Sequence, residues 1–143
     1  MYEDILARVD LFSDLTKKEL GEIGSSCQQR NYPAGTALVR QGDTGVGLYI
    51  LTKGKVRVTQ ERNPDKAEVE LGVNGPGDVF GEMALLDDLP RSATITAIDE
   101  VTALLLPVWE FRTTLRNHPD IALKLLSVVS RRLRKAQAPG TDR

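Results

Sequence analysis

The sequence predicts an α+β fold that is mainly β: an eight-stranded jelly roll (a double-stranded β-helix) with helices before and after it. Three observations support this prediction. Apolar residues recur with a helical period at both ends of the 143-residue chain. Between about Arg30 and Leu106 the period changes to two, and glycine-rich turns separate short strands at regular spacing. Such strands are typical of a sandwich or a barrel, and the jelly roll is the eight-stranded form that we expect.

We expect one domain over the whole chain, because a chain of this length buries roughly 68–70% of its unfolded surface without crosslinks. Its expected parts are N-terminal helices over 1–29, a β-roll over 30–106 that contains a cassette over 80–95, C-terminal helices over 107–137 and a flexible tail over 138–143.

The N-terminal segment has a helical pattern that begins again after a break. Thr16 followed by Glu19 is a capping box, in which each side chain accepts a hydrogen bond from the other's backbone N–H. Leu20, Ile23 and Cys27 then continue one apolar stripe. The only cysteine is therefore predicted to be a small buried residue on a helix, with no partner for an internal disulfide.

The middle of the chain alternates between apolar and polar residues. Lys53-Gly54 separates two alternating runs and predicts a hairpin, because glycine tolerates a positive φ. In the second run Val56 and Val58 are predicted to face inward, with Arg57 and Thr59 outward. The strands expected from this pattern are Thr36–Arg40, Leu48–Thr52, Lys55–Gln60, Val69–Val73, Ile95–Ala97 and Val101–Leu106.

Two helices are expected at the C-terminal end. Pro119 suits the first turn of the second helix, which runs from Asp120 to about Ala136 and carries an apolar stripe wider than one neighbour requires. Cations gather at its end, where they match the helix dipole. A solvated helix end explains them; contact with phospholipid, a partner or a base is the alternative. These cations are Arg131, Arg132, Arg134 and Lys135.

The most informative stretch runs from Phe80 to Ile95, and we call it the cassette. Gly81 permits a tight turn, and a helical turn beginning near Glu82 presents unpaired N–H groups that suit an anion. Arg91 returns a permanent cation to the same place after Leu89-Pro90 ends the helix. The pattern predicts a ligand with an anionic group close to a hydroxyl. The alternative is that Glu82 and Arg91 only pair with each other.

The cassette resembles the phosphate-binding cassette of cyclic nucleotide-binding domains, the family of catabolite activator proteins, cAMP-dependent kinase regulatory subunits and cyclic-nucleotide-gated channels. The resemblance rests on Phe-Gly-Glu-Met-Ala-Leu-Leu followed by Pro-Arg-Ser-Ala-Thr, and it extends from Leu11 to about Leu133. It implies that Arg91 pairs with the cyclic phosphate and that Glu82 accepts a hydrogen bond from the ribose 2′-hydroxyl. The ligand-binding set expected from it is Gly81, Glu82, Met83, Ala84, Arg91 and Ser92.

We therefore expect a regulatory module that binds cAMP, with cGMP as the alternative, and that signals by moving its C-terminal helix. In the family this helix often closes over the base as a lid, and Arg132, Leu133 and Arg134 are the expected lid residues. The alternatives are a ligand domain excised from a channel or a transcription regulator, and a ligand-free interaction domain on the same fold. Intact Glu82 and Arg91 argue against the last of these, because an unliganded buried ion pair stabilises little.

Composition excludes several other classes. A single histidine, His118, cannot supply a metal-dependent active site, so we expect no enzyme, no metal and no cofactor beyond the nucleotide ligand. A net charge of −1 argues against nucleic-acid binding through this domain. No helix-turn-helix follows within the chain, no apolar run is long enough for a membrane span, and no secretory pattern begins it. A cytoplasmic location is expected, with a second copy of the chain or a flanking effector domain as partner.

Overall fold

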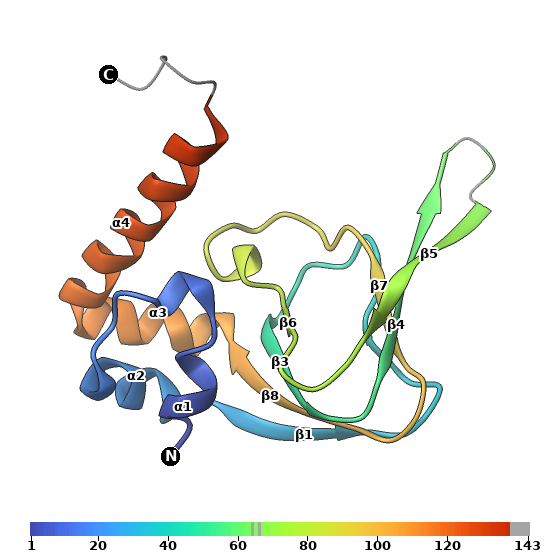
Figure 1. Ribbon diagram of the computed structural model, residues 1–143, viewed down its shortest axis with the longest axis horizontal. Coiled ribbons are helices and arrows are strands. Elements are labelled where there is room, and N and C mark those ends of the chain that lie inside the picture. The colour runs from blue at the N-terminus through green and yellow to red at the C-terminus, as the bar shows by residue number, and fades with distance from the viewer. Residues whose placement is uncertain (64, 66, 138–143) are drawn as a thin grey trace. The chain divides into compact units, whose positions relative to one another are not determined.

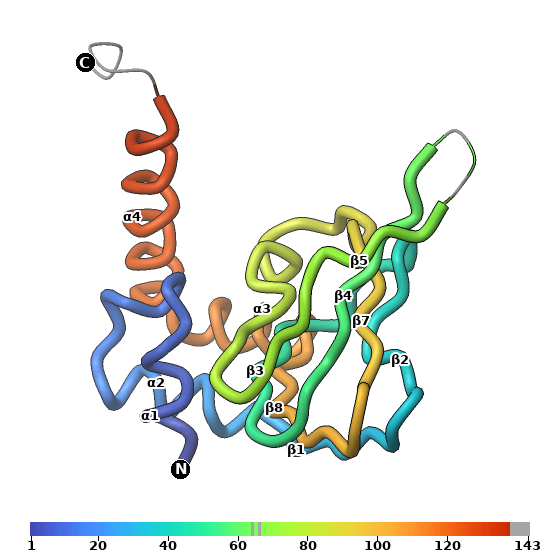
Figure 2. Tube along the Cα trace, turned by 45° about the vertical axis from the view of Figure 1, so that its right-hand side comes forward, coloured from blue at the N-terminus to red at the C-terminus, as the bar shows by residue number. Residues whose placement is uncertain are grey.

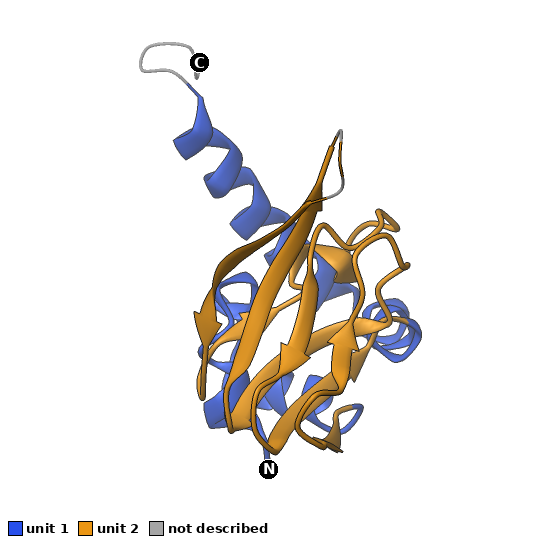
Figure 3. Cartoon of the chain, turned by 90° about the vertical axis from the view of Figure 1, so that its right-hand side faces the viewer, with its two compact units in different colours: residues 1–26, 109–143 blue, residues 27–108 orange. Residues whose placement is uncertain are grey.

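The structure is a computed structural model that describes residues 1–63, 65 and 67–137 (Figure 1). The tail expected over 138–143 lies outside the described residues. The chain divides into two compact units, a helical one made of residues 1–26 and 109–143, and a β one made of residues 27–108 (Figure 3).

The β unit is the expected roll, with two antiparallel sheets of four strands each. The strand order is β1-β8-β3-β6 in one sheet and β2-β7-β4-β5 in the other. The β4–β5 hairpin extends beyond the rest of this unit (Figure 1). The strands are β1 (Gln28–Tyr32), β2 (Ala37–Val39), β3 (Gly47–Lys53), β4 (Val56–Arg62), β5 (Ala67–Asn74), β6 (Val79–Phe80), β7 (Thr94–Ala97) and β8 (Val101–Pro107). The hairpin predicted at Lys53-Gly54 is wrong, because β3 and β4 belong to different sheets; the turn at Gly54, with a φ of 84°, connects the two sheets.

Alternating residues from both sheets form the core of the roll, and this explains the period of two in the sequence. Val56 is fully buried and Arg57 is exposed, as expected. The prediction that Thr59 faces outward is wrong, because this side chain is 7% exposed. The pairing of β4 with β5 shifts register between Val58 and Thr59, and such a bulge breaks the alternation.

Two strands were not expected from the sequence. The prediction of helix up to residue 29 is wrong at its end, because α2 stops at Gly24 and β1 begins at Gln28. Cys27 thus lies half-buried before a strand and not on a helical stripe. The polar sequence of β1 has no strand periodicity, and its partner β8 is about 75 residues away in the chain, at the pairing of Gln28 with Leu105. The short β6 was missed for the same reason, since only its pairing with β3 defines it.

The helical unit contains both ends of the chain, and Figure 2 shows the path of its backbone. The expected capping box is present: Thr16 Oγ1 accepts from the N–H of Glu19 at 3.2 Å, and Glu19 Oε1 accepts from the N–H of Thr16 at 2.9 Å. Phe12 and Phe111, both buried, pack with ring centroids 6.0 Å apart. The helices are α1 (Glu3–Leu6), η1 (Asp10–Phe12, a 3₁₀ turn), α2 (Lys17–Gly24), α3 (Val108–Asn117) and α4 (Pro119–Ala136).

The last helix, α4, is held against the N-terminal segment by charged side chains. Lys124 donates to Glu19 at 2.6 Å, and Arg132 donates to Asp10 at 2.6 Å. One face of α4 is buried, whereas Leu126 and other apolar residues remain exposed, as the wide stripe predicted. No helix in the described part of the chain is long and apolar enough to cross a membrane.

Candidate ligand-binding site

The cassette turns sharply between β6 and a single 3₁₀ turn, η2 (Met83–Leu85). Gly81 has a φ of 84°, in the region that side chains rarely adopt, so the turn requires glycine there. Leu85 is 1% exposed and anchors η2 to the roll, while Met83 is 44% exposed. The helical turn expected over Glu82–Leu86 is thus present, shorter than an α-helix.

All of the ligand-binding residues predicted from the sequence line one cavity of about 470 Å³ in the β unit. The hydrophobic side of this cavity comes from Val79, Phe80, Leu89 and Pro90. The predicted lid residues lie elsewhere, on α4 in the helical unit, where Arg132 pairs with Asp10 and Leu133 is 61% exposed. The cavity is large enough for a small molecule of nucleotide size.

The backbone around Arg91 is held by the loop between β2 and β3. The N–H of Arg91 donates to the carbonyl of Asp43 at 2.8 Å, and the carbonyl of Arg91 accepts from the N–H of Gly42 at 2.9 Å. Thr44 and Pro90 form an adjacent β-bridge. This strand-like pairing fixes the direction in which the Arg91 side chain leaves the backbone.

The guanidinium of Arg91 packs against Gly47 and Tyr49 of β3 and against Gly45 just before that strand, and we call these three residues its seat. Its Nη2 donates to the carbonyl of Gly47 at 2.5 Å, and its Cζ lies 5.9 Å from the centroid of the Tyr49 ring, within the range of a cation–π contact. Nε is buried and has no hydrogen-bond partner among the described residues. Burial lowers the pKa of Arg91 below its usual value, while Tyr49 acts in the opposite direction. An arginine nevertheless stays charged at neutral pH.

Among the residues that the structure describes, the side-chain hydrogen bond of Arg91 goes to the carbonyl of Gly47. This acceptor is neutral, while two residues with carboxylates, Glu82 and Asp87, line the same cavity as Arg91. A charge partly removed from water is costly, and an anionic ligand in the cavity would lower that cost.

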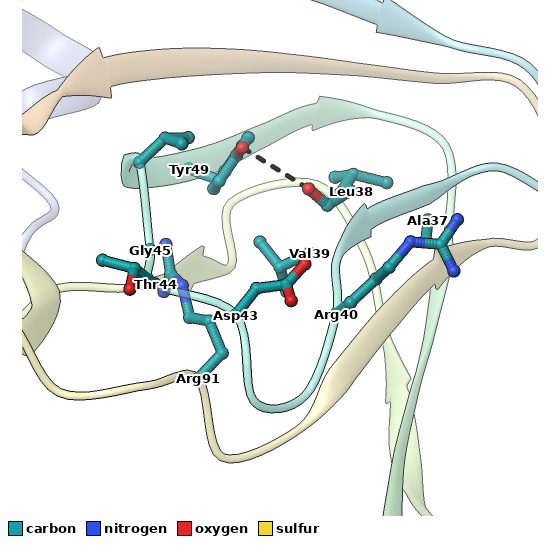
Figure 4. Close-up of a pocket in the computed structure, with 10 residues that line it drawn as sticks. Ala37, Leu38, Val39, Arg40, Asp43, Thr44, Gly45, Tyr49 and Arg91 are labelled. Carbon is teal, nitrogen blue, oxygen red and sulfur yellow. Dashed lines mark hydrogen bonds between the residues drawn. The ribbon is translucent and has the colours of Figure 1, made fainter.

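A second, smaller cavity of about 170 Å³ also touches Arg91 (Figure 4). Tyr49 and Gly45 line it on the side of the guanidinium, and Arg40 lines its far end. The Tyr49 hydroxyl donates a long hydrogen bond, 3.4 Å, to the carbonyl of Leu38. Arg91 lines both cavities.

Sequence reasoning found the cassette and missed the residues that seat its arginine. Gly45, Gly47 and Tyr49 lie more than 40 positions before Arg91, and nothing local links them to it. The close spacing of two glycines just before a strand was the available sequence signal, since such glycines often permit close backbone approach.

The single histidine lies at the junction between α3 and α4. His118 occupies the N-cap position of α4, donates its N–H to the Thr114 carbonyl at 2.8 Å, and has Nε2 3.4 Å from Glu22. Among the residues that the structure describes, no cluster of three or more metal-binding side chains occurs.

The jelly roll, with a cavity lined by a half-buried arginine and a tight glycine turn, defines a ligand-binding sensor domain. Residues 29–118 match the cyclic nucleotide-binding domain family, and the chain belongs to that family. This confirms both the resemblance and the fold class predicted from the sequence. The family and the relatives below are regulatory, so the expectation that the chain is not an enzyme is also confirmed.

Three known proteins illustrate the similarity. The CRP-like cAMP-activated global transcriptional regulator of Mycobacterium tuberculosis is 34% identical over 133 residues, which is 93% of this chain and 59% of that regulator. The crystal structure of the N-terminal domain of a transcriptional regulator from Streptomyces coelicolor A3(2) has a TM-score of 0.85 and 37% identity, covering 98% of this chain and 96% of that one. The regulatory domain of Toxoplasma gondii PKA, co-crystallised with cAMP, has a TM-score of 0.71 and 27% identity, covering 89% of this chain and 49% of that one.

Proposed function

We propose that this chain is a regulatory module that binds cAMP in the cavity lined by the cassette. The observation that carries the proposal is Arg91, a half-buried cation in that cavity whose side-chain hydrogen bond goes to a neutral carbonyl. In this proposal the cyclic phosphate pairs with the positive charge of Arg91. The names of the Mycobacterium and Toxoplasma relatives both refer to cAMP, which supports adenine over guanine.

The cassette residues have separate roles in this proposal. Arg91 pairs with the cyclic phosphate, and the N–H groups of Gly81 and Ala84 donate to it. Glu82 accepts a hydrogen bond from the ribose 2′-hydroxyl, while Ser92, whose carbonyl accepts from Gln60 at 2.9 Å, keeps its hydroxyl for the phosphate or the base. A Ser92 hydroxyl also suits the 2-amino group of guanine, so cGMP is the competing ligand.

Titration calorimetry with cAMP tests the assignment of Arg91. A charge-assisted hydrogen bond contributes about 1.5–3 kcal/mol, so Arg91→Ala should weaken cAMP binding roughly 100-fold. Arg57→Ala is the matched control, because Arg57 is an exposed arginine of the same roll that pairs with Glu70. Equal affinities for the Arg91→Ala and wild-type chains would refute the role of Arg91, and cGMP binding far more tightly than cAMP would reverse the choice of base.

The ribose contact is tested with 2′-deoxy-cAMP and the Glu82→Ala variant. If Glu82 accepts from the 2′-hydroxyl, each change alone weakens binding and the two losses do not add. Fully additive losses would place the role of Glu82 elsewhere.

We further propose that α4 reports ligand binding to a partner, either a second copy of the chain or a flanking effector domain. In the structure Arg132 pairs with Asp10, and Arg131 pairs with Asp14 at 2.8 Å. A ligand shifts such a helix only if it binds one arrangement more tightly than another. Arg132, Leu133 and Arg134 are the residues proposed to reach the base.

Hydrogen exchange with and without cAMP tests this second proposal. Protection should rise in residues 80–92 and also in residues 127–135. If only the cassette responds, and removal of the chain after Ser127 leaves affinity unchanged, α4 is neither a lid nor a reporter.

A further inference from the structure

The residues that contact the Arg91 guanidinium lie outside the cassette, and their contacts suggest that they orient this side chain. We propose that Tyr49 and Gly45 are positioning residues for the anion site, because together they hold the Arg91 guanidinium in the orientation that receives the ligand phosphate. This inference rests on the proposed function and names the residues that make its central cation effective.

Tyr49 forms the floor of the seat. It is 4% exposed and belongs to the apolar core of the roll, so its ring is held by packing on the side away from the arginine. Tyr32 packs edge-on against it, with centroids 6.4 Å apart. A cation–π contact with a buried ring is stronger than one in water, because little solvent screens it. Tyr49 therefore offsets part of the cost of keeping Arg91 half-buried before an anion arrives.

Gly45 forms a wall of the seat. A Cβ atom at this position would lie 2.5 Å from Nε of Arg91 and 2.8 Å from its Cζ, so any side chain would displace the guanidinium. The φ of Gly45 is not in the left-handed region, so the backbone does not require glycine there. Space for the arginine is thus the reason that the structure offers for glycine at this position.

Two substitutions test these roles in the full chain, with cAMP binding measured by competition against a fluorescent cAMP analogue. Gly45→Ala should weaken binding about 10-fold with little change in melting temperature, because only the flexible end of Arg91 must move. Tyr49→Leu should weaken it about 5- to 30-fold, the range expected for loss of a cation–π contact of 1–2 kcal/mol. Tyr49→Phe keeps the ring and should bind nearly as the wild type does.

A double-mutant cycle separates positioning from general structural damage. If Tyr49 acts through the guanidinium, Tyr49→Leu should cause no further loss in the Arg91→Ala background. Val56→Ala is the control, since it removes buried atoms of the same core at a residue that lines neither cavity, and it should leave affinity close to that of the wild type.

The outcomes distinguish this inference from the proposed function. Absence of cAMP binding by the wild-type chain would overturn both. If the wild type binds and Arg91→Ala fails to, wild-type affinity in folded Gly45→Ala and Tyr49→Leu chains would overturn the positioning role alone. An equal loss from Tyr49→Leu with and without Arg91 would also overturn it. Should Tyr49→Leu not fold, Gly45→Ala still decides the question.

Discussion

Gly81→Ala offers a direct test of how closely the cassette packs around its arginine. A Cβ atom at position 81 would approach Nη1 of Arg91 and would lie 2.6 Å from the carbonyl oxygen of Gly47, which belongs to a strand and cannot move freely. The φ of 84° adds a separate cost. Gly35→Ala is the matched control, because Gly35 has a φ of 86° and open space around the same position.

The two variants share the conformational cost and differ in the steric one. A positive φ costs an alanine about 1–2 kcal/mol, and reduced freedom of the unfolded chain returns roughly 0.4–1 kcal/mol. Gly35→Ala should therefore lower the free energy of unfolding by about 1 kcal/mol. Overpacking adds about 1–3 kcal/mol for Gly81→Ala, for a total of about 2–4 kcal/mol.

Thermal unfolding followed by circular dichroism measures this difference, at roughly 2–4 °C in melting temperature per kcal/mol. Gly81→Ala should also weaken cAMP binding, since the guanidinium must leave its seat, whereas Gly35→Ala should not. Equal melting temperatures for the two variants, with unchanged affinity in both, would refute the close approach of Gly81 to Arg91.

Three further predictions concern stability. Thr16→Ala removes one side of the capping box and should lower the free energy of unfolding, measured by urea denaturation, by about 1 kcal/mol. Thr16→Ser keeps a hydroxyl and should retain most of that free energy; equal losses in the two variants would contradict the role of the cap. Burial, helped by Tyr49, raises the pKa of Tyr32 from 10.0 to about 12, so its neutral form is favoured in the folded chain. Stability from this group is complete below pH 10 and is lost as the pH rises through 12, so melting temperatures of Tyr32→Phe should fall less steeply over that window. The hydrogen bond from Lys124, helped by the one from the backbone of Thr16, lowers the pKa of Glu19 below 4.5. The stability that Glu19 contributes is therefore present above pH 4.5 and is lost as the pH falls through the lowered pKa. Lys124→Met should raise the pKa of Glu19 in an NMR titration.

Local chemistry explains what was predictable from the sequence. The capping box of α2 and the positive φ of the turn at Gly54 depend on neighbouring residues, and both were predicted correctly. The hairpin predicted at that turn is wrong, because β3 and β4 pair with other strands in two different sheets, and such pairing is not local. The cassette is equally local: Gly81, Glu82 and Arg91 lie within 11 positions of one another, and a tight turn suffices to gather them around one cavity. For these features, residues close together in the sequence are enough to define the local geometry.

Long-range pairing explains what was missed. The polar strand β1 exists because β8 offers it hydrogen-bond partners, and the burial of Thr59 follows from a register shift between two strands. Neither has a local pattern, because strand pairing and register depend on residues far away in sequence.

The proposed anion site also combines local features with features that depend on distant residues. The sequence by itself determined which residue carries the positive charge and which turn lies beside it. Only the tertiary structure decided how that charge is held, since Gly45, Gly47 and Tyr49 approach Arg91 from more than 40 positions away, once the roll has closed. A cation can be recognised from its side chain, but its orientation and the degree to which it is removed from water depend on the atoms that folding brings around it.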